Sequence, residues 1–149
     1  LSFFEELRTK LQAELGNDWF VSNNAAVYQN WCGLSISHND WGDIKIVLEK
    51  EKKEGVKGGV LYGIVAPDHL WDRATINKNL LEVELFANNF NNTAGWPFHK
   101  ILFWLNTNEE KAKMFDDSLR PDFITWVYSQ LLEMALDCKE PLKSIPQVK

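Results

Sequence analysis

The chain has 149 residues, the size of one domain, and it is long enough to bury a core without a disulfide or a metal. Its net charge is −5, from 16 basic and 21 acidic residues, which argues against a general nucleic-acid-binding surface. No stretch of about 18 apolar residues occurs, so we expect no transmembrane helix. We expect a single domain over residues 1–149.

The first predicted element is an amphipathic helix over residues 3–15. Ser2 and Glu5 have the spacing of a capping box, and Gly16 is a natural residue for the C-terminal end. The apolar residues that share one helical face are Phe4, Leu7, Leu11 and Leu15. Residues 17–30 follow, and we predict an irregular segment because Asn and Asp stabilise turns through bonds to their own backbone.

Three strands are predicted next, because apolar and polar residues alternate along them. They span residues 31–38, 43–50 and 60–66. In the second strand, Ile44 and Ile46 share a face and Lys45 takes the other. The links 39–42 and 51–59 are short, which favours antiparallel pairing.

Three helices and one strand are predicted after residue 72. The first helix spans about residues 73–90, and a polar loop at 89–95 leads to a strand at 98–105. A short helix at about 109–117 is capped by Asn108. The last helix has Asp122 near its start. The inner stripe of the last helix is Ile124, Val127, Leu131, Met134 and Cys138. The order α-β-β-β-α-β-α-α predicts the α+β class, with about four antiparallel strands packed with three to four helices.

Aromatic residues are abundant, with seven Trp, nine Phe and three Tyr. The tryptophans that flank predicted strands or loops are Trp31, Trp41, Trp71, Trp96 and Trp104. Rings in such places can form the floor of a groove for a peptide, sugar or base, and these five are our predicted binding residues. The same rings can equally close the ends of a hydrophobic core, and this alternative stays open.

A possible metal site lies in the turn between the first two predicted strands. Asp43 and Lys45 form a D-x-K element, in which a carboxylate binds Mg²⁺ and the lysine positions or activates water. Asp40 is the nearest second carboxylate, but it lies too close in the chain to be the usual partner. In an amphipathic strand the same two residues would simply form the solvated side. We therefore predict no catalytic residues and no cofactor, with Mg²⁺ held by this turn only as the alternative.

A second acidic pair, Asp68 and Asp72, brackets His69 and could form a metal or acid–base site. The simpler interpretation is an aspartate that caps a helix N-terminus. The two cysteines, Cys32 and Cys138, have no zinc-ligand spacing and are predicted to be small buried apolar residues. A reducing, cytoplasmic compartment is the simpler inference, although the two could pair.

Three hydrophobic segments resemble one group of proteins. They are Ile36–Trp41, Ile44–Glu49 and Leu61–Ile64, and a late segment from Trp96-Pro97 to Cys138 follows. Over about residues 1–140, this pattern is similar to the accessory C-terminal region of many predicted bacterial PD-(D/E)XK nuclease-family proteins. The chain departs from the nuclease core itself, because Pro67-Asp68 has no matching (D/E)-x-K after it. The resemblance implies an accessory module without nuclease activity.

Three functions are expected in this order. The first is a non-enzymatic recognition module that binds a partner protein or a neighbouring nuclease domain through its tryptophans. The second is a divergent Mg²⁺-dependent nuclease that uses Asp40, Asp43 and Lys45, and the third is a binder of a small ligand. The chain begins with Leu1 rather than Met, which fits processing, missing first residues or excision from a larger protein, and we favour the last.

Overall fold

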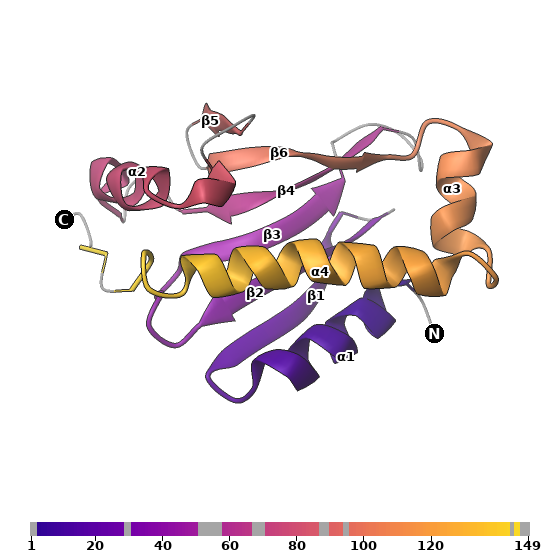
Figure 1. The fold of residues 1–149 in the computed structure, drawn as a ribbon, viewed down its shortest axis with the longest axis horizontal. Coiled ribbons are helices and arrows are strands. Elements are labelled where there is room, and N and C mark those ends of the chain that lie inside the picture. Colours follow the sequence, from indigo (N-terminus) through magenta and orange to yellow (C-terminus); the bar gives the residue numbers. More distant parts are fainter. Residues whose placement is uncertain are drawn as a thin grey trace.

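A six-stranded antiparallel sheet forms the centre of the computed structural model (Figure 1). The residues that it describes are 3–28, 31–50, 58–66, 71–86, 90–93, 96–143 and 145–146. The strands are β1 (Trp19–Tyr28), β2 (Trp31–His38), β3 (Lys45–Lys50), β4 (Gly59–Val65), β5 (Asn91–Thr93) and β6 (Trp96–Trp104). Their order across the sheet is β1-β2-β3-β4-β6-β5, so β1 and β5 are the two edge strands.

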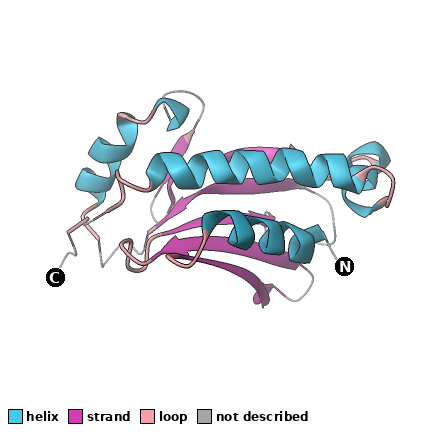
Figure 2. Ribbon diagram, turned by 60° about the horizontal axis from the view of Figure 1, so that its bottom comes forward, coloured by secondary structure: helices cyan, strands magenta, loops and turns pink. Residues whose placement is uncertain are grey.

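Two long helices cover the same face of the sheet, as Figures 1 and 2 show. The helical elements are α1 (Phe3–Leu15), α2 (Arg73–Leu81), the 3₁₀ turn η1 (Glu84–Phe86), α3 (Asn108–Phe115) and α4 (Arg120–Cys138). Helix α4 runs across the sheet beside α1, and α3 stands at the end where α4 begins (Figure 1). Among the described helices, none combines the length and the apolar content that a membrane-spanning segment needs.

The core lies between this helical layer and the sheet. Alternate residues of the central strands are fully buried beneath the helices, among them Ile36, Ile46, Leu48, Tyr62 and Ile64. The predicted stripe of α4 is buried as well, from Ile124 through Cys138. Burial raises the pKa of the Cys138 thiol, and the nearby Asp137 carboxylate raises it further, so this thiol is a packed apolar group.

The predicted α+β class and the order of its elements are confirmed. Helix α1 has the predicted bounds, and Gly16 follows it with a φ of 92°, the left-handed conformation that ends many helices. The other predicted strands and helices after residue 30 lie within a few residues of their predicted positions, apart from the segment 73–95. The residue that caps α3 is Thr107 rather than Asn108, which is instead the first residue of the helix.

The prediction of an irregular segment at 17–30 is wrong, because most of it forms β1. Within β1, Trp19 and Val21 are buried against the helices and Phe20 between them is exposed, as expected of a strand with one solvated face. The side chain of Gln12 supports the start of the strand, since its Nε2 donates to the Trp19 carbonyl at 2.9 Å and its Oε1 accepts from the Val21 N–H at 2.9 Å.

The predicted helix at 73–90 is too long. It ends at Leu81, and the chain then tightens into i→i+3 bonds from the Val83 N–H to the Leu80 carbonyl and from the Phe86 N–H to the Val83 carbonyl. The predicted polar loop at 89–95 contains β5, which pairs with the beginning of β6. With β1 and β5 added, the sheet has six strands instead of the predicted four.

Candidate functional site

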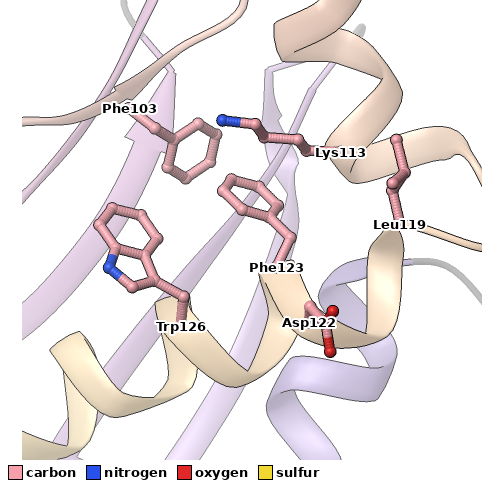
Figure 3. Close-up of a pocket in the computed structure, with 6 residues that line it drawn as sticks. All are labelled: Phe103, Lys113, Leu119, Asp122, Phe123 and Trp126. Atoms are coloured by element: carbon pink, nitrogen blue, oxygen red, sulfur yellow. The ribbon is translucent and has the colours of Figure 1, made fainter.

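An aromatic groove of about 460 Å³ lies where the start of α4 meets β6 and α3. The residues that line it are Phe103, Lys113, Leu119, Asp122, Phe123 and Trp126, and we call this set the aromatic groove (Figure 3). Three rings gather at one end of it, and Leu119 and Asp122 lie toward the other end (Figure 3).

Helical periodicity explains why α4 contributes most of the lining. Leu119 precedes the helix, Asp122 and Phe123 follow it by three and four residues, and Trp126 comes three residues after Phe123. This spacing places the four residues on one side of the helix. This side is separate from the buried stripe of α4, whose nearest members are Ile124 and Val127. Helix α4 therefore has two apolar stripes, one in the core and one in the groove.

The ring of Phe123 contacts the other two aromatic rings of the groove. Its centroid lies 4.9 Å from that of Phe103, at an interplanar angle of 79°, and 5.9 Å from that of Trp126, at 16°. Its other neighbour is Phe3 of α1, whose centroid lies 5.6 Å away. Edge-to-face and stacked pairs of this kind add to the stability that burial provides. The three rings of the groove therefore form one packed aromatic surface.

Exposure differs sharply among these rings. Phe103 is buried in the sheet, whereas 42% of the surface of Trp126 remains open to solvent. Phe115 and Leu119 near the junction of α3 and α4 are also exposed large apolar side chains. Covering the exposed surface of Trp126 with another apolar group would lower the free energy, because apolar surface would be removed from water.

Two charged side chains accompany the rings. Lys113 comes from α3 and extends over the groove toward Phe103 and Phe123, and Asp122 comes from the first turn of α4 (Figure 3). Helix α3, which carries Lys113, is fixed at its start by a complete capping box between Thr107 and Glu110. A ligand would therefore meet mostly apolar surface, with one cation and one anion available for polar contacts.

The five predicted tryptophans occupy different environments. Trp41 is only 1% exposed, its Nε1–H donates to the Lys139 carbonyl at 3.3 Å, and its ring packs against Trp19 with centroids 5.1 Å apart. Trp71 is partly buried against Gly42, and its Nε1 has no hydrogen-bond partner among the described residues. For Trp41, the geometry matches the alternative of closing the core.

The other three predicted tryptophans lie elsewhere. Trp96 is partly buried at the start of β6, with its ring centroid 5.5 Å from that of His99. Trp104 at the other end of β6 is 43% exposed, and it follows Phe103 on the strand, so it points to the opposite face of the sheet. Trp31 belongs to β2, and its side chain lies outside the described residues.

The residues of the alternative metal site lie in and beside the turn that precedes β3. Asp40 and Asp43 are exposed, and Lys45 begins the strand. Asp40 in the turn contacts His38. The Asp40 N–H donates to His38 Nδ1 at 3.0 Å, and the Asp40 carboxylate lies 3.7 Å from the same nitrogen. In the described parts of the chain, no three His, Cys, Asp or Glu side chains come together as metal ligands.

The structure describes only one member of the second acidic pair, Asp72. Asp72 caps α2, because its Oδ1 accepts from the Thr75 N–H at 3.2 Å and its Oδ2 accepts from the Thr75 hydroxyl at 2.8 Å. These hydrogen bonds, first of all that from the Thr75 hydroxyl, lower the pKa of Asp72. The capping interpretation is confirmed for Asp72, whereas Asp68 and His69 lie outside the described residues.

The sequence interpretation missed the aromatic groove. Trp126 is not among the predicted binding residues, because it lies in mid-helix rather than at the end of a strand. A signal was present, since Leu119, Phe123 and Trp126 form a second apolar stripe beside the buried one.

No protein-family model, curated protein or solved structure matches this chain.

Proposed function

We propose that the chain is a non-enzymatic recognition domain that binds an apolar segment of a partner polypeptide in the aromatic groove. The observation that supports this most directly is the exposed ring of Trp126, stacked on Phe123 above the buried Phe103. Trp is among the residues most often found at the energetic centre of protein interfaces. Lys113 and Asp122 at the same groove supply polar contacts that would orient the bound segment.

The partner proposed from the sequence is a bacterial nuclease-type protein or domain in a cytoplasmic setting. Its support is the resemblance of the segments from Ile36 to Ile64 and from Trp96 to Cys138 to the accessory region of PD-(D/E)XK proteins. The full reading frame and its neighbours test this part. A Pro-Asp strand followed at the usual spacing by (D/E)-x-K in an adjoining segment is expected, and its absence would speak against the association.

Two alternatives make different predictions. A small apolar ligand could occupy the same groove, whose volume of about 460 Å³ is within the usual range for ligand pockets. A Mg²⁺-dependent nuclease would instead depend on Asp43, which is exposed in the turn before β3 and does not line the groove. Cleavage of plasmid DNA that disappears in Asp43→Ala would favour this second alternative.

Selection from a displayed library of random twelve-residue peptides tests the proposal. We expect selected peptides to contain large apolar residues and to bind the Trp126→Ala variant at least tenfold more weakly, since truncation of a central interface tryptophan typically costs about 2 kcal/mol or more. Leu136→Ala is the matched control, because Leu136 is an exposed apolar residue of α4 that does not line the groove. Both variants should keep the melting temperature of the parent protein within a few degrees.

Two results would count against the proposal. One is a library that yields no peptide whose binding responds to Trp126→Ala. The other is equal loss of binding in Trp126→Ala and Leu136→Ala, which would indicate a general apolar effect rather than the groove.

A further inference from the structure

Strand β6 extends beyond the neighbour on its outer side. Its first part pairs with β5, through Thr93 opposite Trp96 and Asn91 opposite His99. From Lys100 to Trp104, β4 is the only strand that pairs with it in the described parts of the chain. About five residues of sheet edge, a length of about 17 Å, are therefore left without a described partner strand.

The register shows which backbone groups point away from the sheet along this edge. The Leu105 N–H donates to the Gly58 carbonyl at 2.9 Å, toward β4. Backbone groups alternate in direction along a strand, so those of Trp104 point to the outer edge. His99 lies opposite Asn91 of β5 on that outer edge, so alternation from His99 places the groups of Ile101 there too. Ile101 and Trp104 both point outward, although they are three residues apart, because one extra residue at Leu102 shifts the alternation between them.

At the opposite edge of the sheet, a side chain blocks part of the edge strand β1. At the start of β1, the outward groups of Trp19 and Val21 already bond to the side chain of Gln12 at 2.9 Å each. Native proteins commonly block or shorten their edge strands, because an open edge pairs with other chains. The end of β6 lacks a comparable block among the described residues.

The sequence at the β6 edge is also apolar, unlike that of a protected edge strand. Residues 101–105 read Ile-Leu-Phe-Trp-Leu, an uninterrupted apolar run without Gly or Pro. The register shifts by one residue between the pairs Val60–Phe103 and Leu61–Ile101, which leaves Leu102 as a bulge. Bulges redirect neighbouring side chains and are frequent beside binding sites. Phe103, next to this bulge, also lines the aromatic groove, so β6 contributes residues to both the edge and the groove.

We infer that an extended segment of the partner polypeptide adds to the sheet along Lys100–Trp104 and places a large apolar side chain in the aromatic groove. This inference rests on the proposed function and specifies the conformation of the bound segment. An unpaired strand edge offers alternating N–H and C=O groups, and another polypeptide strand is the ligand that matches this pattern. Side chains of the added strand alternate between faces, so every second one turns toward the groove.

The size of the surface favours a peptide over a second folded copy of the chain. One strand pairing of about 17 Å with one groove buries a few hundred Å² on each partner, below the roughly 800 Å² that a standard stable interface buries. A symmetric β6–β6 pairing would also place the bulge at Leu102 against its own copy and interrupt the ladder. A flexible segment can adjust its register to the bulge.

Amide hydrogen exchange measured by NMR tests the inference, with the tightest peptide from the library described above as the probe. Saturation with the peptide is expected to slow exchange of the Ile101 and Trp104 amides at least tenfold. Ile101→Pro removes one outward N–H and should weaken peptide binding at least tenfold. Asn23→Pro is the control, since it places the same change on the outward side of the opposite edge strand.

A second measurement keeps the test valid if Ile101→Pro unfolds the protein. Two versions of the peptide carry N-methyl groups on alternate residues, in opposite registers. Only the version whose methyl groups face β6 is expected to lose binding, again by at least tenfold, because only those amides pair with the edge.

The outcomes separate the two proposals. Binding that needs Trp126 but leaves the Ile101 and Trp104 amides unprotected, or that tolerates both methylated peptides, would overturn strand addition and leave the groove as the site. A library without a Trp126-dependent peptide would overturn both. Protection of the same amides in the free protein at raised concentration, together with dimer formation, would replace the peptide with a second copy of the chain.

Discussion

Gly63 of β4 lies opposite His99 of β6, with no room for a side chain between the two strands. A Cβ atom at this position would overlap the Phe98 carbonyl oxygen and lie 2.6 Å from the His99 Cα, both of which belong to the backbone of β6. Backbone atoms cannot turn away as a side-chain tip can, so Gly63→Ala must push two paired strands apart. We expect a loss of about 3 kcal/mol in the free energy of unfolding, at the upper end of the range for overpacking.

Urea denaturation followed by circular dichroism would measure this loss. Gly33→Ala is the control, because a Cβ there would meet its nearest atom, the Leu48 carbonyl oxygen, at 3.3 Å. That contact is tight, but it needs only a few tenths of an ångström of relaxation, so the control should lose less than about 1 kcal/mol. Equal effects of the two substitutions would contradict the close approach at Gly63.

The role of individual tryptophans could not be predicted from the sequence. Trp41 lies in a polar turn, yet it is buried because its indole N–H reaches the Lys139 carbonyl, which is 98 residues away in the chain. Trp126 lies in mid-helix, yet it is exposed because its side of α4 faces the groove. Both outcomes depend on which elements meet in space, and local sequence carries little information about that.

At the scale of elements, the start of α3 gives a prediction about capping. The Thr107 hydroxyl accepts from the Glu110 N–H at 3.1 Å, and the Glu110 carboxylate accepts from the Thr107 N–H at 2.9 Å. We expect Thr107→Ala to lower the free energy of unfolding by about 1 kcal/mol, measured by urea denaturation at pH 7. Glu109→Ala, which removes an exposed charge of the same turn outside this box, should have a smaller effect.

The same capping box depends on pH in a defined direction. Hydrogen bonds from the Thr107 and Asn106 N–H groups, the former being the stronger cause, hold the pKa of Glu110 below its ordinary value of 4.5. A lowered pKa in the folded state means that this stabilisation is present above about pH 4.5 and is lost as the pH falls through the folded value. The difference between the parent protein and Glu110→Gln should therefore shrink in acid.

Local signals explain which elements were predictable. Helix α1 has a clear apolar stripe and a terminal glycine, so residues 3–15 were predicted with the observed bounds. Strands β1 and β5 were missed, because their Asn-rich sequences resemble loops and they become strands only by pairing with β2 and β6. Pairing partners and the support from Gln12 are tertiary information that residue propensities do not contain.

At the scale of the whole molecule, the arrangement of layers explains where a binding site can form. Helices α1 and α4 lie side by side on one face of the sheet, where α1 packs mainly on the edge strand β1, and α3 stands at the end of β6 (Figures 1 and 2). The aromatic groove forms where the start of α4 in this helical layer meets β6 and α3. The α+β class was predictable from the order of elements, but the side of the sheet that each helix covers was not.

The packing of α4 on the sheet also predicts how stability changes in alkali. Tyr62 of β4 is buried beneath the helical layer, and burial together with the Glu133 carboxylate of α4 raises its pKa to about 12. The nearby cation is Lys100 of β6, whose Nζ lies 5.9 Å from the centroid of the Tyr62 ring. Because the folded-state pKa is above the unfolded value of 10.0, this contribution is complete below about pH 10 and is lost as the pH rises to about 12.

Comparison with Tyr62→Phe isolates this effect from the other groups that titrate in alkali, such as Lys and Tyr128. By pH 11 the unfolded tyrosine is mostly ionised and the folded one is not, so the parent protein should lose about 1.4 kcal/mol relative to Tyr62→Phe. Urea denaturation of both proteins at pH 8, 9, 10 and 11 would measure the difference. Parallel curves over this range would mean that Tyr62 ionises as easily in the folded state as in water, and that α4 does not seal this part of the core.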